Sequence, residues 1–245
     1  MKIKFLTEPA LLIDDILVIA DLHLGFEYEL SELGIIIPSQ LEKFKVRLNN
    51  LIKQTKAKHL VILGDMKHQV PGISWQEFRE IPEFFRDLNI KISIVKGNHD
   101  GDIERLVPQD VDIYDSAGFV LNKILFTHGQ AWPHPEIVNT EYLIMGHIHP
   151  AIEFWTENVR SSERCWLRCE IDNKKVKEKY QKEAGLKEGI IVPTFNHLLG
   201  GVSFNSKRFK PSGPLLQKEI LKWKDARIYL LDGTFLGNLN NIKKY

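Results

Sequence analysis

The sequence has few of the features that mark membrane proteins, secreted proteins or disulfide-stabilised proteins. Its two cysteines, Cys165 and Cys169, are too few and too close together for a disulfide framework or a Cys-rich zinc site, so we interpret both as reduced structural thiols. No apolar run approaches the roughly 20 residues that span a bilayer, and the N-terminus lacks the apolar core of a signal peptide. We therefore expect a soluble cytoplasmic protein that has no membrane partner.

The net charge is also small, because 33 Lys and Arg nearly balance 32 Asp and Glu and give a formal net charge of +1. The balance hides an asymmetry. Residues 1–149 hold 15 basic and 21 acidic residues, net −6, and residues 150–245 hold the other 18 and 11, net +7. Bound cations would offset the acidic part, and the basic part could face a polyanion, although ordinary solvated lysines explain it about as well.

The chain is long enough for one good core, with 43% hydrophobic and 27% charged residues. It shows no internal repeat and no low-complexity linker. We expect a single domain over residues 1–245, of which about residues 15–150 carry the motifs and residues 151–245 complete a second sheet.

Five apolar runs with the character of buried strands each end in a polar group. The polar groups are Asp21-Leu22-His23, Gly64-Asp65-Met66-Lys67-His68, Gly97-Asn98-His99-Asp100, Thr127-His128-Gly129 and Gly146-His147-Ile148-His149. Ligands bind where such strands end, so these side chains are expected to converge on one site. Glycines 64, 97, 129 and 146 suit sharp turns close to that site.

Two helices are expected between the first three strands. Residues 39–42 have the form of a capping box, and apolar residues then repeat at helical spacing for about four turns. A second capping box at residues 74–77 precedes a helix that Pro82 should kink or divide. Its apolar face is expected to hold Trp75, Phe78, Ile81, Phe85 and Leu88. Alternating strands and helices predict a parallel sheet covered on both faces.

Beyond Tyr114 the pattern changes to hairpins and short elements. Residues 119–126 and 227–237 each predict a hairpin, and residues 132–141 a short helix. Residues 165–171 and 189–192 read as strands. Residues 155–164 are charged and weakly patterned, and residues 173–189 predict an exposed helix or loop.

The strand-end groups contain seven candidate metal ligands with oxygen or nitrogen donors and no sulfur. They are Asp21, His23, Asp65, Asn98, His128, His147 and His149. This set is larger than one ion needs and suits two divalent transition ions, with Mn favoured and Fe, Co, Ni or Zn as alternatives. Taken singly, a strand-end Asp or His is more often a cap or turn residue.

In order and spacing, these five groups resemble the motifs of the calcineurin-like metallophosphoesterase superfamily. Gly-Asp-x-x-His together with Gly-Asn-His-Asp is similar to the branch of the SbcD-type nucleases and their small archaeal relatives. Residues 193–201 weakly resemble a segment of small phosphoesterases encoded beside bacterial DNA ligases. The resemblance implies an α/β fold, a four-layer α/β/β/α sandwich of two mixed β-sheets flanked by helices.

The resemblance also implies a role for each motif residue. One metal would be held by Asp21, His23, Asp65 and His149, and the other by Asp65, Asn98, His128 and His147, so that Asp65 bridges. His99 would protonate the leaving oxygen, Asp100 would orient His99, and His68 would position the phosphate. We interpret the remaining histidines, His59, His134 and His197, as structural or surface residues, with His197 the most probable exception.

The implied activity is hydrolysis of a phosphodiester by in-line attack of a metal-bridging water or hydroxide. The substrate would be a phosphoester, with a short or single-stranded nucleic acid as one candidate, because the chain lacks the length for the DNA-capping domain of SbcD-type nucleases. The alternatives are a dinuclear phosphomonoesterase, a cyclic-nucleotide phosphodiesterase and, in another class, a protein-binding scaffold without activity. His99 argues against the scaffold, because the scaffold proteins of this fold lack that histidine.

Overall fold

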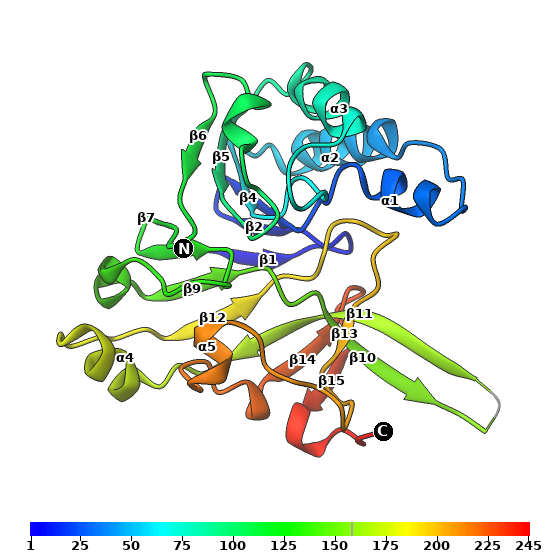
Figure 1. Cartoon of the computed structure of the whole chain (residues 1–245). Coiled ribbons are helices and arrows are strands. Elements are labelled where there is room, and N and C mark those ends of the chain that lie inside the picture. Colours follow the sequence, from blue (N-terminus) through cyan, green and yellow to red (C-terminus); the bar gives the residue numbers. More distant parts are fainter. Residues whose placement is uncertain (158) are drawn as a thin grey trace.

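The computed structural model describes residues 1–157 and 159–245, and two β-sheets stack face to face in its centre (Figure 1). In the view of Figure 1 the N-terminal sheet and its helices lie above, and the C-terminal sheet lies below. Within the described residues, no helix is both long and apolar enough to cross a membrane.

The first sheet has the order β1-β2-β3-β4-β5-β6 and is built from the N-terminal part of the chain. Its strands are β1 (Ile3–Phe5), β2 (Leu11–Ile13), β3 (Ile16–Ala20), β4 (His59–Leu63), β5 (Lys91–Val95) and β6 (Asp112–Tyr114). Strands β3 to β6 run parallel, and β1 and β2 add an antiparallel edge. The parallel strands are joined through α1 (Phe26–Glu32), α2 (Leu41–Thr55) and α3 (Trp75–Phe85).

The second sheet has the order β13-β10-β11-β12-β9-β8-β7, and β14 and β15 extend it from β11. Its strands are β7 (Phe119–Leu121), β8 (Ile124–Thr127), β9 (Tyr142–Met145), β10 (Pro150–Trp155), β11 (Arg160–Cys169), β12 (Glu188–Ile191), β13 (Val202–Ser203), β14 (Arg227–Leu230) and β15 (Phe235–Asn238). Strands β8, β9 and β12 are parallel. The remaining helices are α4 (Asn173–Tyr180), α5 (Gly213–Gln217) and the 3₁₀ turns Ile103–Arg105, Pro135–Asn139, Trp223–Asp225 and Leu239–Asn241.

Three apolar cores hold the layers together. The middle core joins the sheets, with Val18 and Val61 of the first sheet packed with Ile144 and Trp166 of the second. A second core lies between the first sheet and helices α2 and α3, and a third joins the second sheet to α4, α5 and the C-terminal turns. Helices therefore cover the outer faces of two mixed sheets, which confirms the predicted fold class.

The α3 region confirms the predicted capping box, excludes division of the helix at Pro82 and corrects the buried face. The capping box forms, because Ser74 Oγ accepts from the backbone N–H of Glu77, whose carboxylate accepts from that of Ser74. The helix is not divided at Pro82 but continues to Phe85; Pro82 leaves only the carbonyl of Phe78 without its helical partner, on the exposed side. Trp75 and Phe78 are 61% and 66% exposed rather than part of the buried face.

At the start of α2 the predicted capping box does not form. The helix begins at Leu41 with Gln40 as its N-cap residue, whose side chain makes no capping hydrogen bond. The backbone N–H of Gln40 instead donates to the buried carboxylate of Glu27 on α1, at 2.7 Å. Ser39 still accepts from the backbone N–H of Leu41 at 3.2 Å, so a local and a distant side chain both bond the start of α2.

The elements beyond Tyr114 agree with most of the predictions. Both hairpins form, as β7–β8 and β14–β15, and residues 132–141 contain a 3₁₀ turn. Of the charged stretch 155–164, Trp155 ends β10 and Arg160 begins the long strand β11 that pairs with β10, while residue 158 lies outside the described residues. Cys165 and Cys169 are free and buried, as expected for structural thiols.

Candidate metal centre

The predicted ligands follow five strands whose carboxyl ends meet between the sheets. Asp21 and His23 follow β3, Asp65 follows β4, Asn98 follows β5, His128 follows β8, and His147 and His149 follow β9. Parallel strands place their carboxyl ends at one edge, and stacking the two sheets brings these two edges together. Each sheet therefore contributes ligands to one site.

Two groups of ligand atoms form within this site. The atoms of Asp21, His23 and His149 all lie within 4.8 Å of one another, and so do those of Asp65, His128 and His147. Asp65 joins the groups, because its Oδ2 lies 3.5 Å from Nε2 of His23 and 3.3 Å from Nε2 of His128. The Oδ1 of Asn98 lies 3.3 Å from Nε2 of His128. The structure thus brings all seven predicted ligands together, with Asp65 in the middle.

One ring nitrogen in the site is without a hydrogen-bond partner, which is consistent with a cation site. Nε2 of His23 is fully buried and has no hydrogen-bond partner, yet it faces the carboxylate of Asp65. A buried polar atom without a partner costs about 1–3 kcal/mol, which a bound cation would offset. The donors are carboxylate, amide and imidazole groups without sulfur, a set that suits divalent first-row ions.

The backbone of the ligand segments is held in an uncommon conformation. Five ligands have φ between 45° and 73°, in the left-handed region; they are Asp21, His23, Asp65, His147 and His149. This conformation costs of order 1–3 kcal/mol for a residue with a side chain, and it persists where the surrounding structure enforces it. Such clustering of strain is typical of sites where function constrains the chain.

Hydrogen bonds from outside the ligand set orient two of the imidazoles. Nδ1 of His128 lies 2.7 Å from the carbonyl oxygen of Leu63, so it carries the proton and leaves Nε2 free for a cation. Nε2 of His147 lies 3.1 Å from Oγ of Ser212, which leaves Nδ1 for the same role. Partners of this kind fix the tautomer and direction of metal-binding histidines.

Two glycines allow the ligand segments to approach one another. A Cβ at Gly97 would lie 2.2 Å from Oδ1 of Asp65, and one at Gly64 would lie 2.2 Å from Nδ1 of His128. Gly64 also has a φ of 74°. Side chains at these positions would occupy the space that the ligands need.

Burial and neighbouring charge set the protonation of the site. Burial lowers the pKa of His23 to about 3, and burial with the charge of His128 lowers that of His147 to about 4. Both rings are therefore neutral at pH 7, as metal ligands must be.

The pair at the centre behaves differently. Burial opposes protonation of His128, but the hydrogen bond and charge of Asp65 outweigh it and raise the pKa of His128 to about 9. Burial likewise opposes ionisation of Asp65, but His128 and His23 hold the pKa of that carboxyl below its ordinary value. A proton on His128 thus occupies the place that a cation would take, and the two compete.

His99 and His68, the predicted catalytic histidines, border the ligand group. Ligand atoms of His23, His68 and His99 lie within 4.8 Å of one another, and the His23 and His99 rings are 4.7 Å apart. The backbone N–H of His99 donates to Oδ1 of Asp65 at 2.9 Å, and its Nδ1 lies 2.5 Å from the carbonyl oxygen of His68. These contacts place His99 beside the centre with Nε2 available.

Asp100 is buried beneath this loop and holds its backbone. Its carboxylate accepts from the backbone N–H groups of Met66 at 2.8 Å, Lys67 at 3.1 Å and Gly97 at 2.9 Å. Burial raises the pKa of Asp100, with the charge of Asp65 acting in the same direction. The His99 ring donates to the carbonyl oxygen of His68 and not to Asp100. Orientation of His99 by Asp100 therefore stays a prediction, and it would act through the backbone of the loop.

The sequence analysis missed two residues that support the first motif. The hydroxyl of Thr194 donates to the carbonyl oxygen of Asp21 at 2.8 Å, and Nδ2 of Asn196 donates to that of Leu22 at 2.9 Å. They follow β12, a sixth strand that ends at the site. The signal was present, because residues 189–192 read as a strand that ends in polar residues.

The three remaining histidines lie outside these ligand groups. His59 begins β4 and contacts Ser93, His134 is exposed beside the turn Pro135–Asn139, and His197 is exposed near Arg47. His197 follows Asn196 and so borders the segment that supports the site. The positions of His59 and His134 agree with their interpretation as structural or surface residues.

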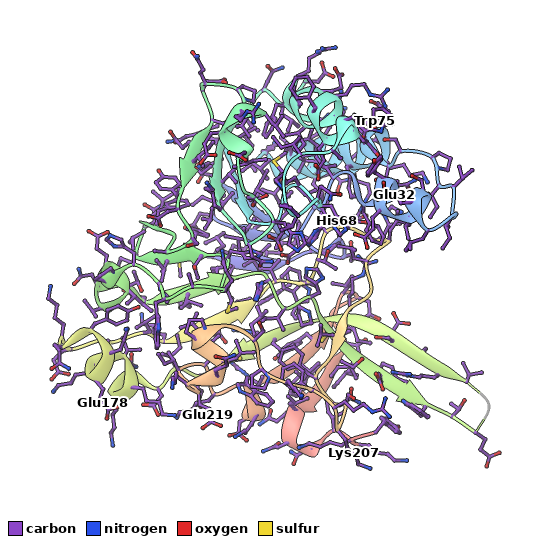
Figure 2. The ribbon with its side chains drawn as sticks, viewed as in Figure 1. Glu32, His68, Trp75, Glu178, Lys207 and Glu219 are labelled. Carbon is purple, nitrogen blue, oxygen red and sulfur yellow. The ribbon has the colours of Figure 1, made fainter. Side chains whose placement is uncertain are left out.

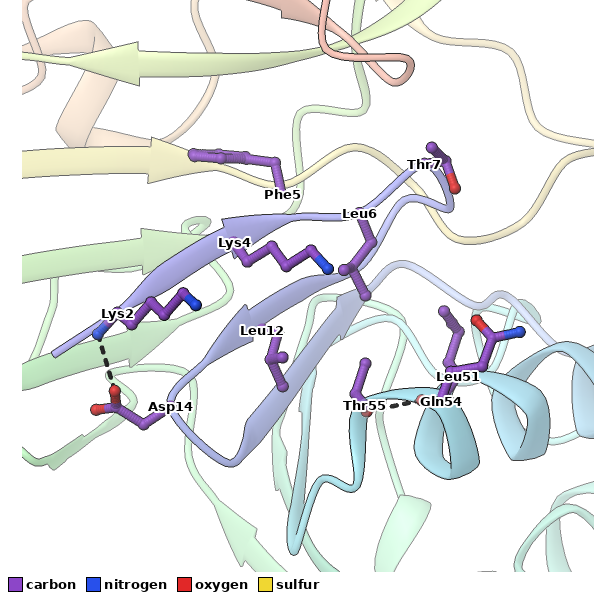
Figure 3. Close-up of a pocket in the computed structure, with 10 residues that line it drawn as sticks. All are labelled: Lys2, Lys4, Phe5, Leu6, Thr7, Leu12, Asp14, Leu51, Gln54 and Thr55. Carbon is purple, nitrogen blue, oxygen red and sulfur yellow. Dashed lines mark hydrogen bonds between the residues drawn. The ribbon is translucent and has the colours of Figure 1, made fainter.

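The surface also has concavities away from these ligands. A cavity of ≈ 490 Å³ is lined by Lys2, Lys4 and Asp14 together with residues from the end of α2 (Figure 3). Asp14 precedes β3, whereas Asp21 follows its other end, so this cavity is separated from the ligands by the length of a strand. We place the functional site at the strand ends because the chemistry-bearing side chains converge there.

Comparison with known proteins agrees with this assignment. The sequence pattern of the calcineurin-like phosphoesterase family matches residues 15–167, and the chain belongs to this family. Among proteins with curated descriptions, none matches significantly. The fold is similar to that of the nuclease MPE of Pseudomonas putida, with a TM-score of 0.57 and 20% identity over 96% of this chain and 94% of that one. The phosphoesterase YfcE of E. coli is more distant, with a TM-score of 0.43 and 16% identity over 91% and 96%.

Membership of this family, together with the ligand groups, indicates a metal-dependent phosphoesterase. Proteins of the family use divalent metal ions, and the groups of ligand atoms described above are candidates to hold them.

Proposed function

We propose that the protein is a dinuclear phosphodiesterase that cleaves short or single-stranded nucleic acid. The observation that carries this proposal is the position of Asp65 between two groups of ligand atoms, within reach of both His23 and His128. One carboxylate shared by two sets of nitrogen and oxygen donors is the arrangement that two-metal hydrolysis needs.

The ligand sets divide at Asp65. Asp21, His23 and His149 would hold one ion with Asp65, and Asn98, His128 and His147 would hold the other. Bound divalent cations supply a water of lowered pKa and stabilise negative charge on the phosphate oxygens. Mn is the ion we expect, because ligand sets without sulfur accept it readily.

His99 is proposed to protonate the leaving oxygen. Its Nδ1–H donates to the carbonyl oxygen of His68, so the proton to transfer is the second one, which the imidazolium form carries on Nε2. A phosphoester with a poor leaving group needs such an acid, and an imidazole supplies it near neutral pH. No covalent nucleophile is required from the protein.

We favour a diester over a monoester because a basic segment precedes Ser212 in the chain. Lys207, Arg208 and Lys210 are exposed and precede Ser212, whose hydroxyl contacts His147. A strand of nucleic acid has further phosphates that these cations can reach, whereas a small monoester has none. His68 is proposed to assist as well; a phosphate contact from its ring requires one of its present hydrogen-bond partners to leave.

A direct comparison of substrates tests the proposal. Mn²⁺-loaded protein should hydrolyse bis-p-nitrophenyl phosphate faster than p-nitrophenyl phosphate and should cleave single-stranded oligonucleotides. His68→Ala should lower the diester rate more than the monoester rate. A monoester that is the better substrate with every metal, without cleavage of oligonucleotides, would leave only a dinuclear phosphatase. Absence of all hydrolysis would favour a scaffold.

A further inference from the structure

We propose that Glu29 is a positioning residue that sets the tautomer of the metal ligand His23 through the ring of His68. The proposal rests on the metal centre proposed above and concerns the protein before substrate binds. Nε2 of His68 contacts the Oε2 carboxylate oxygen of Glu29 on α1, and its Nδ1 lies 3.1 Å from Nδ1 of His23. Both nitrogens of the His68 ring are therefore engaged.

Hydrogen-bond chemistry fixes the direction of this chain from the Glu29 end, and this direction is also the one that a bound cation requires. Nε2 of His23 is the buried atom without a partner, and it must be free of a proton to bind a cation. The neutral ring then carries its proton on Nδ1, which donates to Nδ1 of His68. His68 in turn carries its proton on Nε2, which donates to Glu29, because an ionised carboxylate only accepts.

Loss of the Glu29 carboxylate would leave the positions of the protons on the His68 and His23 rings unfixed. Without Glu29, His68 can place its proton on either nitrogen, and a proton on its Nδ1 would face the proton on Nδ1 of His23. The two rings avoid this clash when His23 moves its proton to Nε2, which blocks the ligand atom. Glu29 thus acts on the ion through two imidazoles without touching it.

The surroundings of His68 keep its ring in line for this role. Its backbone N–H donates to the buried carboxylate of Glu77 at 2.8 Å, and the ring of Phe26 packs against it at 4.9 Å. Glu29 itself is on the surface, with 53% of its side chain exposed. Changing it leaves no cavity, and an exposed ion pair contributes little to stability, so a variant should fold.

The chain offers a control of the same kind on the same helix. Glu32 is exposed in the last turn of α1 and does not contact His68. Figure 2 labels Glu32 on α1 and His68 beneath it, beside the sheets. Replacing Glu32 removes the same charge from the same helix and leaves the His68 contact in place.

Mn²⁺ titration of the metal-free protein is the first measurement. Glu29→Ala and Glu29→Asp should weaken one of two Mn²⁺ sites by about 10–100-fold, the usual effect of losing an outer partner of a metal-binding histidine. Glu29→Gln should stay within about threefold of the parent, because its amide oxygen still accepts from Nε2–H. Glu32→Ala should match the parent. Equal affinities in Glu29→Ala and the parent, or equal weakening by Glu32→Ala, would overturn the proposal.

A second measurement does not depend on the metal. Imidazole ¹⁵N–¹H correlation spectra of the metal-free protein should show His23 with its proton on Nδ1 in the parent and in Glu29→Gln, and a mixture of tautomers in Glu29→Ala. If the parent binds no ion but shows this pattern, the proposed dinuclear function fails while the chain from Glu29 to His23 stands. If the parent shows His23 protonated on Nε2, the chain is wrong whatever the activity.

Discussion

Nδ1 of His99 lies 2.5 Å from the carbonyl oxygen of His68, and this contact decides which nitrogen of His99 can act on a substrate. The acid is thereby fixed in place by the loop that also carries Asp65. We expect His99→Ala to keep its metals and fold and to lose roughly 10²–10⁴-fold in turnover on an unactivated diester. Steady-state kinetics would show it, with exposed His134→Ala as the control. The loss should shrink for good leaving groups, and an undiminished rate would remove His99 from the mechanism.

Asp65 lies between the two ligand groups, so its removal should damage both. Asp65→Asn replaces a carboxylate by an amide that carries no charge and has one donating end. We expect metal content to fall from close to two ions per chain to less than one. Elemental analysis measures it, and Asp110→Asn, an exposed change of the same kind, should keep two. Unchanged metal content in Asp65→Asn, or a single ion in the fully loaded parent, would contradict the dinuclear centre.

Metal affinity should depend on pH through His128. Its pKa in the folded protein is about 9 against 6.5 for an ordinary histidine, so it holds a proton at pH 7 that a cation must displace. Affinity of that site should rise about tenfold per pH unit from pH 7 and level off near 9. In the metal-free protein, the same proton contributes stability that is fully present below pH 6.5 and lost as pH rises through 9. Calorimetry in buffers of different ionisation enthalpy would count the released proton; an affinity independent of pH would contradict the assignment.

Gly97 has space for no side chain, because a Cβ there would lie 2.2 Å from Oδ1 of Asp65. We expect Gly97→Ala to displace Asp65, weaken metal binding and destabilise the fold by about 1–3 kcal/mol. Gly101→Ala is the matched control in the same loop, where nothing lies within 4 Å of the added atom. Thermal unfolding and metal titration would compare the two. Equal stability and equal metal affinity of the two variants would mean that the loop accommodates the added methyl group without moving Asp65.

The basic segment that precedes Ser212 should set the salt dependence of nucleic-acid binding. We expect single-stranded oligonucleotides to bind weakly, with affinity falling steeply between about 50 and 200 mM salt. Lys210→Glu should reduce the slope of log affinity against log salt by about 0.7 or more, the share of one single-strand phosphate. Fluorescence anisotropy would measure it, with exposed Lys53→Glu on α2 as the control. If Lys53→Glu changes this slope as much as Lys210→Glu does, the net charge of the protein alone would explain the effect.

The ligand set could be predicted from sequence because each ligand directly follows an apolar run, a local signal. Parallel strands bring the ligands of one sheet to one edge, so Asp21 and Asp65 were expected to meet, whereas the contact of Asp21 with His147 also depends on the stacking of the two sheets. Thr194 also follows a predicted strand, but its role could not be assigned from sequence, because it bonds the backbone of Asp21, 173 positions away. Trp75 was misplaced for another reason: it precedes the buried Phe84 by nine residues, which at about 100° per residue places it on the opposite, exposed side of α3.

Glu29 illustrates a second limit. An exposed glutamate on a seven-residue helix has no pattern that separates it from Glu32, and only the position of His68 distinguishes them. The failed capping box at Ser39 has the same origin, since Glu27 reaches the helix start from another part of the chain. Local sequence patterns thus identified the candidate ligands, whereas the contacts that hold these ligands in place join residues that are distant in the sequence.

Because Asp21 and His149 share one ligand group, an ion between them would close a loop of more than half the chain. Closing so long a loop removes conformations from the unfolded chain, as a disulfide does, although Cys165 and Cys169 remain free thiols. Such a cross-link opens with a chelator instead of a reductant. The free concentration of the metal would then govern how long the folded protein survives as well as how fast it works.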